Sequence, residues 1–350
     1  MALQWQQYSG KWNLQTQGQA EGAGTWIKPF NYLWAWGQGG NGRLGLGNTT
    51  NYSSPVLVGA SLWSSIDSGN YFTIALKTDG TIWSWGSGGL GKLGLGNTTD
   101  YSSPKQIGAL TDWAFSSCGT NATYAVKTDG TMWSWGFGSG GRLGHGNTTT
   151  YSSPKQVGAL TTWAKTTGSN EYGGAVKTDG TLWMWGDNYH GQLGTNNKTS
   201  YSSPVQIGAL TDWASIHAGE NQNLAIKTDG TLWSWGVNGA GQLGLGDTTD
   251  RSSPVQVGAL TDWSIVQAGN NMTIAIKTDG TMWSFGQNNR GQLGNSPSYP
   301  YPFESSPVQI GALTSWSAIF CGAQHTIAVR TDGTMWSWGD NDEGELGIGS

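Results

Sequence analysis

The sequence predicts an all-β protein, a seven-bladed β-propeller with four antiparallel strands in each blade. The main observation is a string Trp-x-Trp-Gly that begins at Trp34, Trp83, Trp133, Trp183, Trp233 and Trp336, with Trp283-Ser-Phe-Gly as a seventh copy. The successive copies lie 49, 50, 50, 50, 50 and 53 residues apart. Lys/Arg-Thr-Asp-Gly-Thr and Ser-Ser-Pro each occur six times in step with this string. A period of about fifty residues with strand-type content is typical of a radial β array.

The segment 263–311 shows how one unit is built. Residues 263–269 form a short apolar strand that ends at a glycine, and residues 273–277 form a second. Asp279-Gly280 then provides a two-residue hairpin, because glycine tolerates the positive φ of such turns. Residues 282–286 form the third strand. Residues 307–311 form the fourth, and its leading Pro307 favours the outer edge of the blade.

This pattern divides the chain into one domain, 1–350, of consecutive blades. The blades are expected at 12–58, 59–108, 109–158, 159–208, 209–258, 259–311 and 312–350. In the first blade, residues 12–18, 25–28 and 33–37 fit the first three strands. The last blade lacks a fourth strand, so residues 1–11 are expected to supply it and to close the ring.

The composition excludes several classes of protein. Of 350 residues, 57 are glycine, 12% are aromatic and only 11% are charged, with a net charge of −5. Disordered chains need high charge and few aromatics, and so many glycines would destabilise helices. A weakly acidic chain has no electrostatic reason to bind nucleic acid or anionic membranes.

The N-terminal residues and the cysteines indicate the compartment. The first residues have no basic and apolar segments of the signal-peptide kind, and no stretch of 18 apolar residues is found. Cys118 and Cys321 alone do not make a disulfide framework, and buried free thiols are expected. We therefore expect synthesis in the cytoplasm without a signal peptide.

The tryptophans of the repeated string are expected to be structural. Two residues separated by one position on a strand point to the same face of the sheet, which packs on the next blade in a propeller. A stacking platform for sugars or bases is the alternative, but the strict period favours core packing. The structural set is Trp34, Trp83, Trp133, Trp183, Trp233, Trp283 and Trp336.

The repeat, Lys-Thr-Asp-Gly-Thr-x-Trp-Ser-Trp-Gly followed by a glycine-rich loop and Leu-Gly, resembles the regulator of chromosome condensation repeat over essentially the whole chain. The resemblance implies a seven-bladed propeller and no single activity, since propellers of this kind serve as exchange factors, protein inhibitors, ligase adaptors and surface or virion proteins. The low charge and nearly identical repeats resemble bacterial and bacteriophage members.

No motif indicates catalysis, a cofactor or a metal. The four histidines occupy different slots in different blades, so no nucleophile and base pair is suggested. The aspartate of each Thr-Asp-Gly is interpreted as turn chemistry. Residues 340–345 lack the ligands of a calcium loop, and the glycine-rich loops lack Gly-Lys-Ser/Thr.

Candidate interaction residues lie on the face that varies between blades. In an antiparallel blade the first–second and third–fourth loops emerge on one face, where each blade has its own sequence, and such loops commonly bind partners. Drift without function is the alternative. The candidates are Tyr71, Phe72, Asn121, Phe137, Glu171, Tyr172, Tyr189, His190, Asn271 and Arg290.

Two further features extend this candidate face. Arg43, Lys92 and Arg142 precede Leu-Gly in the first three blades and predict a basic sector, or else a solvated face. Tyr299, Tyr301 and Phe303 lie in a proline-rich insertion, which is either a contact patch or a local cap.

These observations favour a non-enzymatic structural or interaction propeller that binds a protein partner through its variable loop face. A bacteriophage capsid or tail protein is one such partner, which would place the chain in a virion. The alternatives are a carbohydrate-binding adhesive propeller and a regulator or inhibitor of a GTPase or another enzyme. Neither nucleic acid binding nor membrane insertion is expected.

Overall fold

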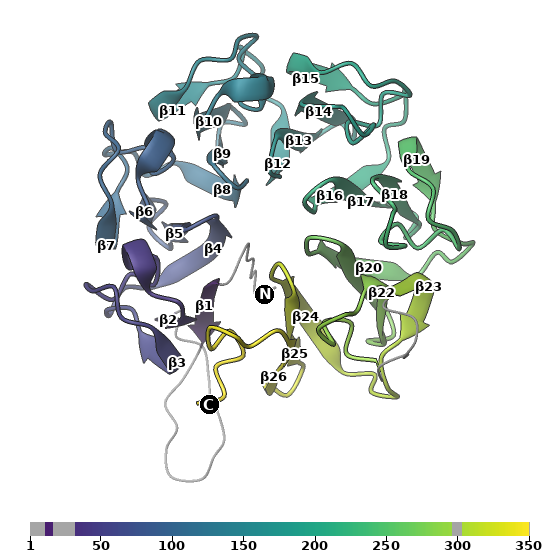
Figure 1. Ribbon diagram of the computed structural model, residues 1–350. Coiled ribbons are helices and arrows are strands. Elements are labelled where there is room, and N and C mark those ends of the chain that lie inside the picture. The colour runs from purple at the N-terminus through teal and green to yellow at the C-terminus, as the bar shows by residue number, and fades with distance from the viewer. Residues whose placement is uncertain (1–10, 17–31, 296–302, 350) are drawn as a thin grey trace.

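The chain folds into a β-propeller, in which antiparallel sheets are arranged radially around a central axis (Figure 1). The structure, a computed structural model, describes residues 11–16, 32–295 and 303–349. In each complete sheet the first strand lies nearest the axis and the fourth lies at the rim (Figure 1).

Five sheets have four strands, paired in chain order. The first two are β4 (Trp63–Gly69), β5 (Phe72–Lys77), β6 (Ile82–Gly86) and β7 (Tyr101–Gln106), then β8 (Trp113–Cys118), β9 (Ala122–Lys127), β10 (Met132–Gly136) and β11 (Tyr151–Gln156). The third is β12 (Trp163–Gly168), β13 (Tyr172–Lys177), β14 (Leu182–Gly186) and β15 (Tyr201–Gln206). The fourth and fifth are β16 (Trp213–Ala218), β17 (Gln222–Lys227), β18 (Leu232–Gly236) and β19 (Arg251–Gln256), then β20 (Trp263–Ala268), β21 (Met272–Lys277), β22 (Met282–Gln287) and β23 (Phe303–Gln309).

The sheets at the two ends of the chain have three strands each among the described residues. They are β1 (Lys11–Thr16), β2 (Tyr32–Gly37) and β3 (Tyr52–Leu57), and β24 (Trp316–Cys321), β25 (His325–Arg330) and β26 (Met335–Gly339). The prediction of seven complete four-stranded blades is therefore wrong. The segment 1–10, expected to supply a closing strand, lies outside the described residues.

The first sheet also corrects the predicted strand order. Trp12 pairs with Trp36, so β1 lies directly beside the Trp-x-Trp-Gly strand. In the complete sheets that place belongs to the second strand, as when Ala75 pairs with Trp83. Residues 12–18 were expected to form the first strand instead, and residues 25–28, expected as the second, lie outside the described residues.

The Thr-Asp-Gly hairpins are confirmed as turn chemistry. Oδ1 of Asp179 accepts hydrogen bonds from the backbone N–H of Thr181 at 3.0 Å and from its hydroxyl at 2.6 Å. That hydroxyl in turn accepts the indole N–H of Trp183 at 2.8 Å. Gly180 has a φ of 76°, which a residue with a side chain rarely adopts.

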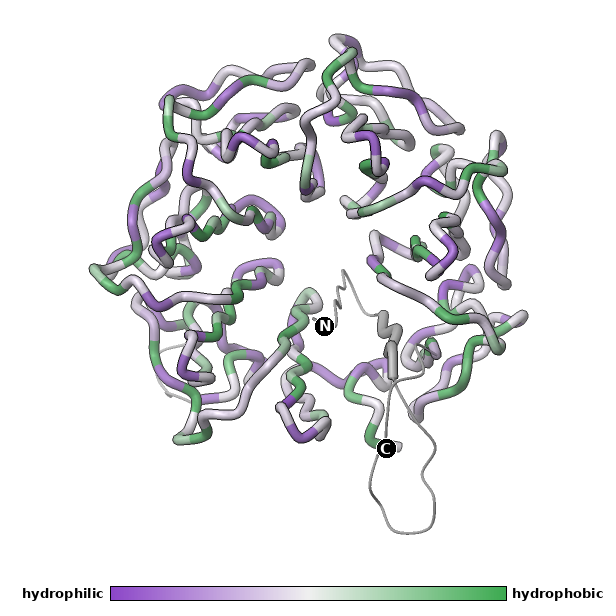
Figure 2. The backbone as a smooth tube through the Cα atoms, turned by 180° about the vertical axis from the view of Figure 1, so that it is seen from behind, coloured by the Kyte–Doolittle hydropathy of each residue, from purple (hydrophilic) through white to green (hydrophobic). Residues whose placement is uncertain are grey.

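The hydrophobic core is divided among the boundaries between neighbouring sheets. At one boundary Leu33 and Leu44 of the first sheet pack with Trp63 and Trp85 of the next. Equivalent clusters follow around the ring, and hydrophobic segments recur in step with them (Figure 2). Each fully buried tryptophan removes about 150–250 Å² from water, so these boundaries carry much of the stability.

The ring is closed by packing between the last sheet and the first. Trp36 is buried in one cluster with Phe320 and Ile327. Its indole N–H donates to the carbonyl of Glu345 at 3.0 Å, and the N–H of Gly349 donates to the carbonyl of Ser53 at 2.9 Å. Within the described residues, the last and first sheets are thus joined by these contacts, and the predicted closing strand at the N-terminus lies outside those residues.

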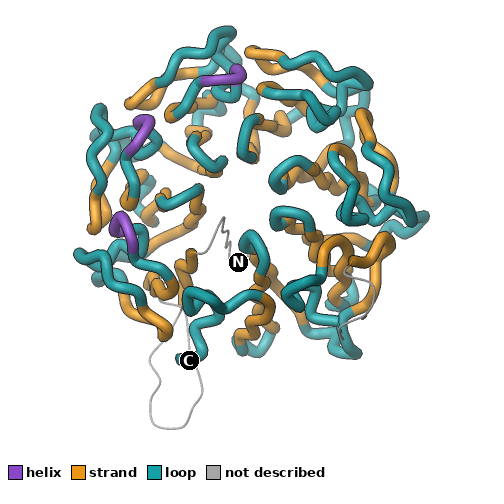
Figure 3. Tube along the Cα trace, viewed as in Figure 1, coloured by secondary structure: helices purple, strands orange, loops and turns teal. Residues whose placement is uncertain are grey.

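Helix is confined to three single turns in the described residues, η1 (Gly40–Gly42), η2 (Gly89–Gly91) and η3 (Ser139–Gly141) (Figure 3). Each follows the third strand of its sheet or, in the first sheet, β2. In the part of the chain that is described, no helix is long and apolar enough to cross a membrane.

Candidate functional site

The candidate site is the face of the disc that carries the turns between first and second strands and those between third and fourth strands, here called the loop face. The antiparallel pairing of each complete sheet brings these two sets of turns to the same side. The inner turns are joined to one another. The N–H of Asn70 donates to the carbonyl of Thr120 at 3.0 Å, and the N–H of Thr120 donates to that of Ser169 at 3.1 Å.

Tyr71 is the most distinctive residue of the loop face. It lies in the two-residue turn between β4 and β5, has a φ of 67° and is 41% exposed. The guanidinium of Arg43, from the preceding sheet, lies 4.1 Å from the centre of its ring. A side chain at positive φ is unfavourable by roughly 1–2 kcal/mol, so this exposed ring is held in a strained conformation.

Leu90 repeats this combination on the next turn of the same sheet. It has a φ of 64° and is 42% exposed, where the equivalent residues in the neighbouring sheets are Asn41 and Gly140. The carbonyl of Tyr71 accepts the N–H of Ser87 at 2.7 Å, which joins the two turns. Leu90 was not among the predicted residues, although a leucine at a position where the neighbouring repeats have asparagine or glycine can be recognised in the sequence.

Two predicted contact residues are instead part of the core. Phe72 and Tyr172 are both fully buried. The hydroxyl of Tyr172 donates to the carbonyl of Gln222 in the next sheet at 3.0 Å. Each begins a second strand, and its side chain points into the sheet boundary, so the prediction that these residues contact a partner is wrong.

The predicted basic sector is also wrong. Arg43, Lys92 and Arg142 are only 4–5% exposed. Nζ of Lys92 donates to the carbonyl of Asn70 at 3.0 Å, and Nε of Arg142 donates to that of Ser139 at 2.8 Å. Burial lowers the pKa of Lys92 to about 8 and that of Arg43 to about 10. These side chains stabilise turns, and they leave no cationic patch for a partner.

Four candidates are half-buried and support neighbouring turns. Asn121 accepts from Lys92 at 3.4 Å, Asn271 accepts from Gln242 at 3.2 Å, and the ring of Phe137 lies 4.9 Å from the guanidinium of Arg142. Glu171 lies 4.0 Å from Arg142. A hydrogen bond with the carboxyl of Asp187 and partial burial raise the pKa of Glu171.

The remaining candidates are exposed on the loop face or lie at the rim. Tyr189 is 73% exposed and His190 follows it. Arg290 is exposed and pairs with Asp342 at 3.4 Å and Asp340 at 3.8 Å. Phe303 is half-buried at the start of β23. Tyr299 and Tyr301 lie outside the described residues.

The tryptophans predicted to be structural are mostly half-buried. Trp34, Trp83, Trp133, Trp183, Trp233 and Trp283 are of intermediate exposure, whereas Trp336 is 49% exposed. The second aromatic of the string is the better core residue, because Trp36, Trp85, Trp135, Trp185, Trp235 and Phe285 are all fully buried. Trp336 is more exposed because β26 has no fourth strand beside it in the described residues.

Asp67 and His217 are titratable residues of first strands, near the axis (Figure 1). Asp67 is fully buried and accepts the backbone N–H of Ser68 at 2.6 Å and of Cys118 at 2.7 Å. Burial raises the pKa of Asp67 to about 8 and lowers that of His217 to about 4. Among residues 11–16, 32–295 and 303–349, no three His, Cys, Asp or Glu side chains are grouped so as to hold a metal.

Comparison with known families decides the relationship. The signature of the Regulator of chromosome condensation (RCC1) repeat matches residues 31–76, 79–126, 129–174, 179–226, 229–276 and 279–329. The chain belongs to the RCC1 repeat family. The signature matches six repeats, not the seven units that we counted from the Trp-x-Trp-Gly strings. A second signature of the same family matches 63–92, 263–292 and 316–345. No curated protein sequence matches the chain.

Solved structures show the same fold. Prp20p from Saccharomyces cerevisiae is 23% identical with a TM-score of 0.81, over 93% of this chain and 84% of its own; it was studied for binding to Gsp1p and histones. Human WBSCR16 is 21% identical with a TM-score of 0.80, over 91% of each chain. Yeast RCC1 (Prp20) bound to Kap60 is 22% identical with a TM-score of 0.77, over 95% of this chain and 88% of its own. At these identities the likeness shows the fold alone.

Proposed function

We propose that this chain is a non-enzymatic interaction propeller that binds a protein partner through its loop face, centred on Tyr71 and Leu90. The observation that carries the proposal is the pairing of strain with exposure. Both residues have a positive backbone φ, and they are 41% and 42% exposed. Outliers of this kind concentrate at functional sites.

The environment of these two residues suits a protein partner. Tyr71 offers a rigid aromatic surface backed by a guanidinium, and aromatic residues are the commonest energetic centres of protein interfaces. The surrounding turns are joined by backbone hydrogen bonds, so little ordering entropy is lost on binding.

A GTPase is the second candidate partner. Its support is the shared fold with yeast Prp20p, whose binding to Gsp1p has been studied. The more specific expectations of a capsid or tail partner, or of a glycan, have no support from the comparisons, and the proposal does not extend to them.

The test uses asparagine, because Asn41 already occupies the position of Leu90 at a φ of 59° in the first sheet. In the variant Tyr71→Asn/Leu90→Asn, the change at Leu90 should stabilise the fold by about 1 kcal/mol, since asparagine tolerates positive φ. At Tyr71 the same gain is offset by loss of the contact with the Arg43 guanidinium. The double variant should also lose the partner that the parent chain retains from an extract of its source. A matched control, Tyr189→Asn, removes an exposed aromatic elsewhere on the same face.

Proteins retained by the parent and by the control, but lost with the double variant, would support the proposal. If one of the retained proteins is a GTPase, and if it releases labelled nucleotide faster in the presence of the parent chain, a GTPase partner is favoured. Identical sets of retained proteins for the parent and the double variant would refute the role of Tyr71 and Leu90.

A further inference from the structure

The opposite face of the disc, here called the turn face, carries a charged turn beside an exposed leucine at successive sheet boundaries. The hairpin at Asp179-Gly180 touches the connection that leads into β16. The N–H of Trp213 donates to the carbonyl of Gly180 at 3.1 Å, and a Cβ on Gly180 would lie 2.1 Å from the carbonyl oxygen of Thr211. The carboxylate of Asp179 and the exposed Leu210 therefore belong to adjoining segments.

The negative charges of this face point outward while their positive neighbours are buried. Asp179, Asp229 and Asp279 are exposed, and hydrogen bonds from the following threonine lower the pKa of each carboxyl. Nζ of Lys177 lies 3.7 Å from the ring centre of Trp183 and is buried. Lys227, also buried, pairs with Asp212 at 3.4 Å. The solvent-exposed charge of these three hairpins is consequently carboxylate.

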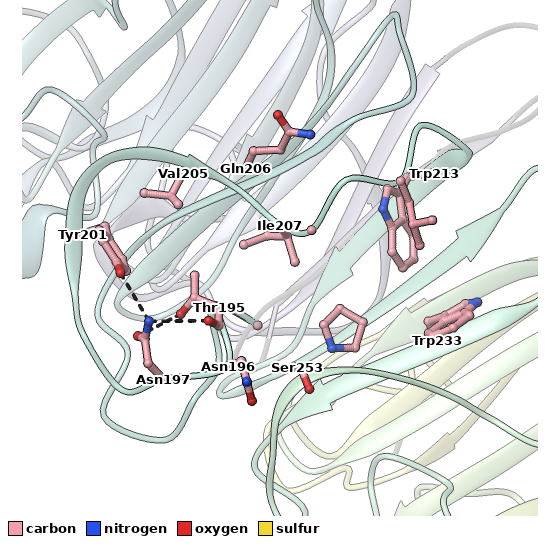
Figure 4. A pocket seen from close by; sticks show the side chains of 14 residues that line it. Thr195, Asn196, Asn197, Tyr201, Val205, Gln206, Ile207, Trp213, Trp233 and Ser253 are labelled. Atoms are coloured by element: carbon pink, nitrogen blue, oxygen red, sulfur yellow. Dashed lines mark hydrogen bonds between the residues drawn. The ribbon is translucent and has the colours of Figure 1, made fainter.

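Two cavities open at consecutive boundaries on the same arc, each of about 440 Å³. The first is lined by Trp213 and Trp233 at one end and by Tyr201 and Asn197 at the other (Figure 4). Leu210, which is 45% exposed, also lines it. A volume of this size accepts one or two large side chains.

The second cavity repeats the first one sheet further on. It is lined by Trp263, Trp283 and Leu260, and Leu260 is 46% exposed. The indole N–H groups of Trp213 and Trp263 are buried and have no hydrogen-bond partner among the described residues. Trp113, Trp163 and Trp316 share this feature, so it belongs to the first strands in general and does not distinguish the two cavities.

The outer strands on the arc from β12 to β23 lack a lysine that two other outer strands carry. The outer strands there carry Val205, Val255 and Val308, where β7 and β11 carry the exposed Lys105 and Lys155 at the same position. Two cations on this arc are engaged within the fold: Arg251 of β19, which lines the second cavity, pairs with Asp247 at 2.6 Å, and Nζ of the exposed Lys165 donates to the carbonyl of Ala214 at 3.1 Å.

We propose that this arc, defined by Asp179, Asp229, Asp279, Leu210 and Leu260, binds a cationic amphipathic segment of a partner protein. Lysine or arginine side chains of the segment pair with the aspartates, and its apolar side chains enter the two cavities. A second copy of this chain is disfavoured because it would present the same aspartates, and nucleic acid is disfavoured because it is itself anionic. The site is distinct from the loop face and does not depend on the function proposed there.

The test measures binding of a fluorescein-labelled synthetic peptide that alternates lysine and leucine, by fluorescence anisotropy on the full chain. The variant Asp179→Asn/Asp229→Asn/Asp279→Asn keeps the Oδ1 acceptor of each turn and removes three charges. It should bind about tenfold more weakly than the parent, with the difference shrinking as salt is added. Leu210→Ser/Leu260→Ser should also weaken binding, and a peptide of lysine alone should bind less well than the alternating peptide.

The matched control, Glu220→Gln/Asp342→Asn/Glu343→Gln, removes three charges from the loop face and should bind the peptide as the parent does. Melting curves of all variants check that the fold is retained. The proposal is overturned if the parent fails to bind the peptide, if the triple asparagine variant binds like the parent, or if the loop-face control loses as much affinity.

Discussion

The contribution of hydrogen bonds between neighbouring sheets to stability can be tested at one backbone carbonyl that accepts two of them. The carbonyl of Lys92 accepts the indole N–H of Trp135 at 3.1 Å and the hydroxyl of Thr123 at 3.0 Å, and both side chains are fully buried. Trp135→Phe removes one of these bonds and some packing, which should destabilise the fold by about 2 kcal/mol. Thr123→Val removes the other at about 1 kcal/mol.

The double variant leaves this buried carbonyl without either side-chain donor. Desolvation of an unsatisfied carbonyl then adds about 1–3 kcal/mol beyond the sum of the two single changes. The assay is urea unfolding followed by far-ultraviolet circular dichroism, because the tryptophan fluorescence itself changes in these variants. Agreement between the double variant and the sum, within about 0.5 kcal/mol, would refute the reasoning.

The chain contains its own control for this cycle. Phe285 replaces the tryptophan at one boundary, and there the carbonyl of Gln242 retains the hydroxyl of Thr273 at 2.9 Å. Thr273→Val alone should therefore cost as much as Thr123→Val in the Trp135→Phe background, and clearly more than Thr123→Val in the parent chain.

Three further predictions follow from backbone geometry and burial. Gly136→Ala should lower the free energy of unfolding by more than about 2 kcal/mol, because φ is 104° and the new Cβ would lie 2.5 Å from a backbone oxygen. In the control Gly158→Ala the new Cβ would have no atom within 4 Å, so the loss should be only about 1 kcal/mol. Equal urea midpoints for the two variants would contradict this. Burial raises the pKa of Asp67 to about 8 from 3.8, so between about pH 4 and 8 the folded state holds a proton that the unfolded state releases. The free energy of unfolding should therefore fall as the pH rises through this range. Asp67→Asn should make the melting temperature less dependent on pH over the same range. Cys118 and Cys321 are buried, and burial raises the pKa of the Cys321 thiol, so neither should react with a coloured thiol reagent until denaturant is added; prompt reaction in buffer would show that the thiols are accessible.

The repeating part of the fold could be predicted because identical local patterns dictate identical local structures. The segment 263–311 was expected to contain four strands, and β20 to β22 begin and end within one residue of the prediction. The fourth strand, β23, begins at Phe303, four residues earlier than expected, so Pro307 lies inside it. An edge strand accepts proline there because the pairing shifts between Ser284 and Gly286.

The ends of the ring could not be predicted in the same way. No repeat covers residues 11–31, so the order of strands in the first sheet rested on analogy with the others. The pairing of Trp12 with Trp36 contradicts that analogy. Closure through Trp36 is a contact between residues more than 300 positions apart, and local pattern contains no information on such contacts.

The loop face shows which part of a site sequence pattern reveals. Variation between units located the face, but it did not separate exposed residues from buried ones. Arg43 was counted as a charged surface residue, yet its guanidinium is buried against Tyr71. Whether an arginine after a glycine-rich turn points outward depends on the ring opposite it, which belongs to another sheet and is not visible in the local sequence.

The contacts nearest the axis have a consequence for assembly during folding. The second and third strands have similar sequences in all the complete sheets, so a third strand from one unit could pair with the second strand of another. The inner strands differ: Asp67 accepts from the N–H of Cys118, the hydroxyl of Ser117 pairs with that of Thr166, and the hydroxyl of Thr167 accepts from the N–H of Ala218. The backbone N–H donors of two of these bonds are available in any unit, but the bond between Ser117 and Thr166 requires a hydroxyl on the neighbouring inner strand, so at that boundary the side chains favour one order of otherwise similar units.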